Sequence, residues 1–175
     1  PMKCAYNGVR TTAWEYAVLA DSPVKSLADL KGRKIGVISL AMGSVPITKA
    51  LLGELKMTAG ADYQIVPVGQ GATAFRALTE KQVDALNLFD GQHLALEFTG
   101  AKIRRLEQPA KYVNQFSNCW VVHNDTLKER PDTVARFGRA FAKASVACQA
   151  NWGECVRNFW GHFPAQKPTE GTEEE

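Results

Sequence analysis

The sequence lacks the features that mark several common classes of protein. It has no apolar run approaching the roughly 20 residues of a membrane-spanning helix. Its net charge is only +3, with 21 Lys and Arg scattered among 18 Asp and Glu, so no basic patch predicts a nucleic-acid partner. A composition of 45% hydrophobic and 22% charged residues is that of a folded globular chain, large enough for one domain or two small lobes.

Residues that carry chemistry are also few and scattered. The histidines are His93, His123 and His162. None has a partner three or four residues away, which disfavours a metal site. The serines lack a GxSxG elbow, and the GQG at residues 69–71 lacks the rest of a nucleotide-binding fingerprint. We expect Asp84 and Asp90 to cap or bracket turns rather than to form a catalytic pair. The sequence therefore predicts no catalytic residues, no metal and no cofactor.

The four cysteines show no metal-ligand spacing. They are Cys4, Cys119, Cys148 and Cys155. Cys148 and Cys155 flank the break between two expected helices and would suit a disulfide in an oxidising compartment. The alternative, which the sequence alone favours somewhat, is four free buried thiols.

The two ends of the chain suggest an internal segment of a longer protein. The chain opens on PMKC with neither an initiator Met at position 1 nor a leader pattern. It closes on residues 172–175, TEEE, which resemble the cap and acidic first turn of a further helix.

The chain is organised around residues 29–44, DLKGRKIGVISLAMGS. A charged turn leads into a short β-prone run at 35–38, and a helical pattern begins directly after a small-residue loop, at Ser44. Unpaired N–H groups and the helix dipole make such a helix start suitable for an anion or a polar ligand. Gly43 permits close approach, and Ser44 can bind a ligand or simply cap the helix. An ordinary cap without a ligand remains the alternative.

Strand and helix patterns alternate along most of the chain. Strands are predicted at 2–6, 13–20, 35–38, 63–68, 83–89, 101–106 and 116–122, and helices at 26–30, 44–57, 72–80, 90–99, 131–150 and 154–162, with a short helix beginning at 124. The Asn-Gly at 7–8 predicts that the first two strands form a hairpin or lie side by side. The apolar stripe of helix 44–57 is predicted as Ile47, Ala50, Leu51, Leu55 and Met57. Alternation of this kind predicts a mostly parallel sheet, with ligand loops at the carboxyl ends of its strands.

Three phrases occur in a recognisable order. The first is DSPVKSLADLKGRKIGV at 21–37 with GS at 43–44, and the second is AL at 77–78 with VDA at 83–85 and FD at 89–90. The third is LKERPDTV at 127–134. Together they resemble the type II periplasmic solute-binding proteins of ABC importers for sulfonates, taurine, nitrate and thiamine pyrimidine precursors. The resemblance covers most of residues 19–144.

The resemblance implies an α/β fold of the type II periplasmic-binding-protein class, with two lobes of mostly parallel sheets. Residues 1–33 would be part of lobe one with the hinge, 34–112 a complete lobe two, and 113–175 the crossover and an α-rich part of lobe one. Lobe one would be incomplete in this chain. The resemblance implies that the protein captures a small polar or anionic organic molecule between the lobes and delivers it to a membrane permease. It also implies an extracytoplasmic location, either periplasmic or lipid-anchored in a Gram-positive host.

The same resemblance implies which residues contact the ligand. They are Ser39, Met42, Gly43 and Ser44 at the first loop, Gly69 and Gln70 at the second, Phe89, Asp90 and Gln92 at the third, and Asn118 in the crossover, with Arg10 and Trp14 as weaker candidates.

Three other identities share the general fold. A TRAP-type receptor is a near neighbour. The effector domain of a LysR-type regulator is a second possibility; no helix-turn-helix precedes it here, but truncation could have removed one. A thiamine-pyrimidine synthase-like enzyme is the third, but those enzymes carry a cysteine cluster and a chemically active histidine, whereas the cysteines here are dispersed.

Overall fold

The computed structural model describes residues 1–115, 118–164 and 167. The chain forms two compact units, one made of Val9–Ser117 and the other of Pro1–Gly8 with Asn118–Glu175. The helix start predicted at 172–175 and the first two residues of the strand predicted at 116–122 lie outside the described residues. Within the described part, no helix has the length and apolar character needed to cross a bilayer.

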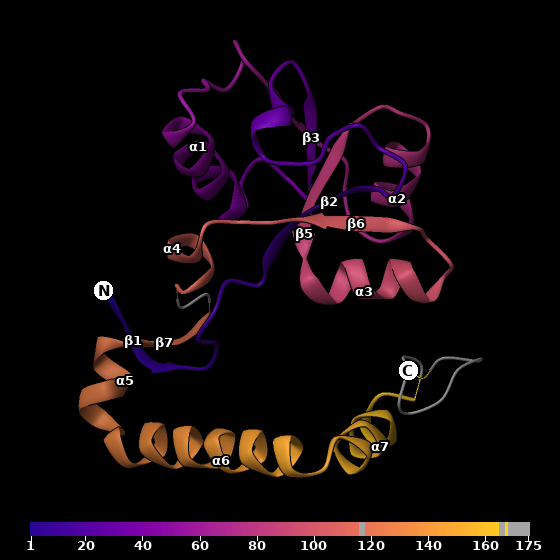
Figure 1. Ribbon diagram of the computed structural model, residues 1–175. Helices are drawn as coiled ribbons and strands as arrows, with labels where there is room; N and C mark the ends of the chain where they lie inside the picture. Colours follow the sequence, from indigo (N-terminus) through magenta and orange to yellow (C-terminus); the bar gives the residue numbers. More distant parts are fainter. Residues whose placement is uncertain (116–117, 165–166, 168–175) are drawn as a thin grey trace. The chain divides into compact units, whose positions relative to one another are not determined.

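The larger unit contains a five-stranded sheet with helices on both sides (Figure 1). Its elements in chain order are β2 (Trp14–Leu19), the 3-10 turn η1 (Ala28–Leu30), β3 (Lys34–Val37), α1 (Ser44–Glu54), β4 (Gln64–Pro67), α2 (Ala72–Thr79), β5 (Ala85–Phe89), α3 (Asp90–Phe98), β6 (Ile103–Leu106) and α4 (Ala110–Val113). The strand order is β4-β3-β5-β2-β6. The predicted alternation of strands and helices is confirmed, and α4 is an addition that the sequence did not suggest.

The sheet is mixed. β3 pairs in parallel with β4 and with β5, with Ile35 opposite both Ile65 and Ala85. β2 runs antiparallel to its two neighbours, β5 and β6. The α/β class is therefore confirmed, and the parallel part is the β3-β4-β5 core, in which each strand is followed by a helix.

The expected pairing of the first two strands is wrong. β1 (Met2–Asn7) pairs with β7 (Cys119–His123), whereas β2 pairs with β5 and β6 in the other sheet. The Asn-Gly pair at 7–8 favours a local turn, but burial has the larger effect on pairing because β2 is largely buried, while β1 is mostly exposed. A strand buried on both faces belongs in the interior of a sheet.

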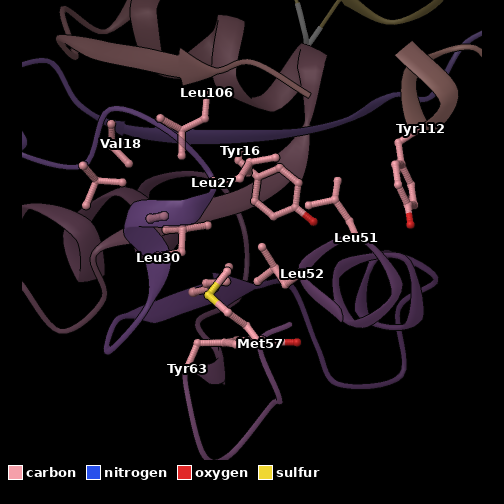
Figure 2. Packing of buried hydrophobic residues seen from close by; sticks show 13 residues of the cluster. Tyr16, Val18, Leu27, Leu30, Leu51, Leu52, Met57, Tyr63, Leu106 and Tyr112 are labelled. Carbon is pink, nitrogen blue, oxygen red and sulfur yellow. The ribbon is translucent and has the colours of Figure 1, made fainter. Parts of the chain in front are cut away.

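Two apolar clusters pack against the faces of the five-stranded sheet. One gathers β2, β3, η1 and α1 around Tyr16, Leu30 and Leu52, as Figure 2 shows. The other joins β5, α2 and α3 through residues such as Leu86 and Leu78. The Tyr16 hydroxyl, buried in the first cluster, forms a 2.7 Å hydrogen bond with that of Thr48 on α1.

The buried face of α1 differs from the predicted stripe. Ser44, Val45, Thr48, Leu51 and Leu52 are buried, whereas Leu55 is 45% exposed and lies after the helix end. Of the predicted residues, only Leu51 is a buried helix residue, and Met57 is buried beyond the helix. The prediction followed apolar side chains alone and missed that Thr48 has a buried partner in Tyr16, so a polar residue faces the core.

In its described residues, the smaller unit consists of the β1–β7 ribbon and three helices. These are α5 (Asn124–Glu129), α6 (Pro131–Ala150) and α7 (Trp152–His162). The Trp120 ring of β7 packs edge-on against Phe137 and Phe141 of α6. α6 begins and ends at the predicted residues, because Pro131 suits a first helical turn and Asn151 caps the next helix.

The preference for four free buried thiols is wrong. Cys148 and Cys155 form a disulfide that joins α6 to α7, with their Cα atoms 5.0 Å apart. Cys4 and Cys119 are free, the first exposed and the second half-buried. The Asn151 side chain accepts a hydrogen bond from the Glu154 amide, which fixes the turn between the two helices and brings the cysteines together.

The larger compact unit starts at Val9, earlier than residue 34, because β2 is paired on both sides within its sheet. The assignment of 1–33, 34–112 and 113–175 to two lobes remains a prediction.

Candidate functional site

Three strand-to-helix loops meet at one edge of the five-stranded sheet. β4, β3 and β5 are adjacent and parallel, and each leads directly towards a helix, α2, α1 and α3 respectively. Val37 near the end of β3 lies opposite Pro67 on one side and Asn87 on the other. Neighbouring strands are about 4.8 Å apart, so the loops that follow these residues emerge close together. This edge is where open α/β sheets bind ligands.

The start of α1 carries the clearest unsatisfied group at this edge. Gly43 is the cap residue and Ser44 is the first helical residue, so the alternative in which Ser44 is an ordinary cap is wrong. The Ser44 side chain is only 1% exposed, and its Oγ has no hydrogen-bond partner among the described residues. A buried hydroxyl without a partner is uncommon and often marks a site completed by a ligand or water.

The approach to α1 is a tight turn built by its backbone. The Met42 amide donates to the Ser39 carbonyl at 3.2 Å, and the Val45 amide donates to the Met42 carbonyl at 3.1 Å. Ser39 and Met42 are half-buried, and Gly43 is exposed. A Cβ at Gly43 would meet no atom within 4 Å, so open space lies next to the helix start.

The second loop is linked to the third by an amide pair. Gly69 and Gly71 have positive φ angles of 74° and 59°, which shape the backbone between β4 and α2. Gln92 Nε2 on α3 donates to Gln70 Oε1 at 2.9 Å, and Gln92 Oε1 is buried and has no partner in the part of the chain that the structure describes. The structure thus brings two predicted site residues, Gln70 and Gln92, into direct contact.

The third loop begins α3. Phe89 is the cap residue and Asp90 follows as the first helical residue, so Asp90 is not the cap that its sequence position suggested. Asp90 is exposed, and its Oδ1 accepts a hydrogen bond from the Gly91 amide at 2.7 Å. The Phe89 ring stacks on Trp14 with 4.0 Å between centroids, which brings Trp14 to the same edge and leaves it 8% exposed.

Asp84 and Asp90 do not form a pair, because they lie at opposite ends of β5. Asp84 accepts a hydrogen bond from the Lys34 amide and another from Arg33, so the predicted structural role of Asp84 is confirmed. Asn118 and Arg10 are exposed. Asn118 belongs to the smaller unit, where its carbonyl accepts from the Gly8 amide, and its role in ligand binding remains a prediction.

The edge is suited to an anion at two of its three helix starts. The first turns of α1 and α2 contain no acidic residue, whereas that of α3 contains Asp90. The positive end of the helix dipole is therefore uncompensated at α1 and α2. Among the described residues, no cluster of three or more His, Cys, Asp or Glu side chains could hold a metal ion.

One cluster behind this edge was not found from the sequence. His93 on α3 is fully buried, and its Nδ1 lies 3.4 Å from Glu15 Oε2 on β2. The contact with His93 and the hydrogen bond from Arg105 on β6 hold the pKa of Glu15 below its usual value, although burial opposes this. The three residues are separated by up to 90 positions, so no local pattern could have predicted their contact.

A family model described as NMT1/THI5 like matches residues 1–153. No curated protein sequence matches the chain. The structure resembles the periplasmic aliphatic sulphonate binding protein SsuA from Escherichia coli, with a TM-score of 0.74 and 21% identity, covering 91% of this chain and 54% of that one. It also resembles the alkanesulfonate-binding protein SsuA from Xanthomonas axonopodis pv. citri, with a TM-score of 0.70 and 15% identity, covering 91% of this chain and 55% of that one.

An arginine transport periplasmic binding protein from Legionella pneumophila is a more distant neighbour, with a TM-score of 0.55 and 16% identity, covering 90% of this chain and 64% of that one. The chain thus spans about half the length of the sulfonate-binding neighbours. These likenesses confirm the periplasmic-binding-protein type of fold.

Proposed function

Because the chain belongs to the NMT1/THI5-like family, we propose that it is part of the extracytoplasmic solute-binding component of an ABC-type importer. Its role is to capture a small polar or anionic organic molecule and to deliver it to a membrane permease. The structural neighbours named for sulfonate and arginine binding support a binding role of this kind. The disulfide between Cys148 and Cys155 agrees with an oxidising, extracytoplasmic location.

The observation that carries the proposal is the buried, unpartnered Ser44 hydroxyl at the start of α1. α1 has eleven residues, follows the central parallel strand of the sheet and carries no acidic residue in its first turn. An anion placed here would accept a hydrogen bond from Ser44 Oγ and would be stabilised by the helix dipole. We infer a sulfonate, carboxylate or similarly compact acceptor group at this end of the ligand.

Gln70 and Gln92 would contact a more distal part of the same ligand. Their mutual hydrogen bond leaves the buried Gln92 Oε1 free to accept from a ligand N–H or O–H group. Polar groups of this kind fix orientation and selectivity more than they add affinity.

The alternative of a thiamine-pyrimidine synthase-like enzyme gains no support from a cysteine cluster. Two of the four cysteines are joined to each other, and the remaining two, Cys4 and Cys119, are side by side in β1 and β7 with no third ligand-type residue grouped with them among the described residues.

A thermal-shift screen of the native protein tests the proposal. The probes are ethanesulfonate, taurine, nitrate, acetate and an aminopyrimidine. A ligand at 100 times its Kd adds about 2.7 kcal/mol to the free energy of unfolding, which is easily detected as a rise in Tm. No stabilisation by any probe would contradict the proposed ligand classes.

A matched pair of variants then locates the site. Ser44→Ala removes the hydroxyl that faces the ligand, and we expect a 10- to 100-fold weaker affinity for the best probe, since a hydrogen bond to a charged group contributes about 1.5–3 kcal/mol. Thr79→Ala removes a hydroxyl that bonds to the Arg76 carbonyl at the far end of α2, and we expect it to leave affinity unchanged. Equal affinity in both variants would remove the start of α1 from the site. Combining Ser44→Pro with Gly43→Val blocks the same place sterically and is expected to abolish binding.

A further inference from the structure

α3 is held against the sheet by polar contacts more than by apolar packing. Only His93 and Leu96 of its nine residues are buried. By comparison, α1 buries five residues. A short helix with one buried apolar side chain gains little from the hydrophobic effect, so other contacts must fix its position.

Those contacts come from the two antiparallel strands. Glu15 on β2 lies at the centre: His93 Nδ1 is 3.4 Å and Arg105 Nε is 3.0 Å from its Oε2. Arg105 on β6 also forms an ion pair with Glu97. His93 and Glu97 are one helical turn apart, so α3 is held at two successive points of the same face.

The contact with His93 is the one that a substitution would disturb most. His93 is completely buried, and neither ring nitrogen forms a hydrogen bond among the described residues; its polar contact is the Glu15 carboxylate, 3.4 Å from Nδ1. The charged groups around it are Glu15 from β2, Arg105 from β6 and Glu97 from its own helix. Loss of Glu15 would leave a buried imidazole with no polar contact, which costs more than loss of an exposed pair.

This cluster lies directly behind the candidate binding edge. His93 follows Gln92, which bonds to Gln70. Glu15 follows Trp14, which stacks on Phe89 at the start of α3 and whose carbonyl accepts a hydrogen bond from Gln108. Because Gln92 and Trp14 are the sequence neighbours of His93 and Glu15, a change in the cluster would shift these two residues at the edge.

We propose that Glu15, His93 and Arg105 are positioning residues that fix the start of α3, and with it Gln92 and Asp90, in the geometry that binds the ligand. The role of these residues in affinity rests on the function proposed above. The anchoring itself does not, and can be measured without any ligand.

The first experiment measures amide hydrogen exchange in the native protein and in Glu15→Ala. We expect the α3 amides to exchange at least tenfold faster in the variant, while those of α1 keep their rates. Glu15→Gln retains an acceptor for His93 Nδ1 and restores most of the protection. Glu80→Ala, which removes an exposed ion pair with Arg76 on α2, is the matched control and leaves α3 unchanged.

A spectroscopic signature separates positioning from general stability. Long-range ¹H–¹⁵N spectra of the unsubstituted protein should show the His93 proton on Nδ1, and Glu15→Ala should remove this signal. Arg105→Lys, which keeps the charge but loses the two-armed contact, serves as a second variant should Glu15→Ala fail to fold. Unchanged α3 exchange and an unchanged imidazole signal in whichever variant folds would overturn the anchoring.

The last arm uses ethanesulfonate, or whichever screened probe binds most tightly. We expect Kd to rise at least fivefold in Glu15→Ala and to recover in Glu15→Gln. Faster α3 exchange with an unchanged Kd would overturn the positioning role while leaving the anchor intact. Absence of binding in the unsubstituted protein would count against the proposed function and not against the anchor.

Discussion

Gly36, in the middle of β3, tests the packing directly because two physical effects predict opposite results. A Cβ at this position would lie 2.9 Å from Leu86 Cδ2, 2.9 Å from Val68 Cγ2 and 3.2 Å from Val83 Cγ2. Leu86 and Val83 are buried, so they have little room to move. Strand propensity and backbone entropy, by contrast, both favour replacing this glycine.

The free-energy cost of the steric clash is larger than the gain from replacing the glycine. Overpacking a closed core costs about 1–3 kcal/mol, whereas removing a glycine gains roughly 0.5–1 kcal/mol. We expect Gly36→Ala to lower the free energy of unfolding by about 1–2 kcal/mol, and Gly36→Val to lower it further although valine is the better strand former.

Urea denaturation followed by circular dichroism measures this difference. Gly53→Ala is the matched control, because Gly53 lies within α1 and a Cβ there meets nothing within 4 Å. It should raise stability by about 0.5–1 kcal/mol. If Gly36→Val proved as stable as the unsubstituted protein, the close packing of β3 against β5 would be refuted.

Three further predictions concern charge and the disulfide. Since the pKa of Glu15 is lowered in the folded protein, Glu15 adds to the free energy of unfolding above the ordinary glutamate pKa, and this contribution is lost as pH falls. Glu15→Gln should therefore reduce the loss of stability at acid pH in denaturation measured against pH. Replacing Cys148 and Cys155 by serine opens a short loop and should destabilise the α6–α7 pair by about 2 kcal/mol, measured by hydrogen exchange with and without reductant. Asp90→Asn removes the acidic group at the binding edge and should tighten anion binding a few-fold at low salt, an advantage that shrinks at high salt in calorimetric titration.

Local elements of this chain could be predicted because local interactions determine them. Pro131 and Asn151 mark the ends of α6, and the loop containing Gly43 separates β3 from α1. Strand partners could not be predicted in the same way. The Asn-Gly pair at 7–8 indicates a turn, but burial of β2 between β5 and β6 decides where that strand pairs.

In the candidate site, too, local features could be predicted from the sequence and long-range contacts could not. Residues in the loop between a strand and a helix or at the start of that helix, such as Gln70 and Ser44, could be predicted from the sequence because the strand-loop-helix pattern marks them. The polar contacts behind them could not. Thr48 faces the core because Tyr16, 32 positions away, supplies a partner, and Glu15 meets Arg105 across 90 positions.

The antiparallel direction of β2 explains why the three helix starts are not equivalent. β2 begins where β5 ends, so the Ala13 carbonyl is placed to accept the Asp90 amide proton at 2.8 Å. The first N–H of α3 is thus satisfied by protein, and the Asp90 carboxylate offsets the positive end of the helix dipole. The first turn of α1 differs in that it has no acidic residue, and the Ser44 hydroxyl has no partner among the described residues. At the proposed site we therefore expect an anionic group to be better stabilised at α1 and hydrogen-bond donors of a ligand to be favoured at α3, so we propose that this edge would select molecules that carry both.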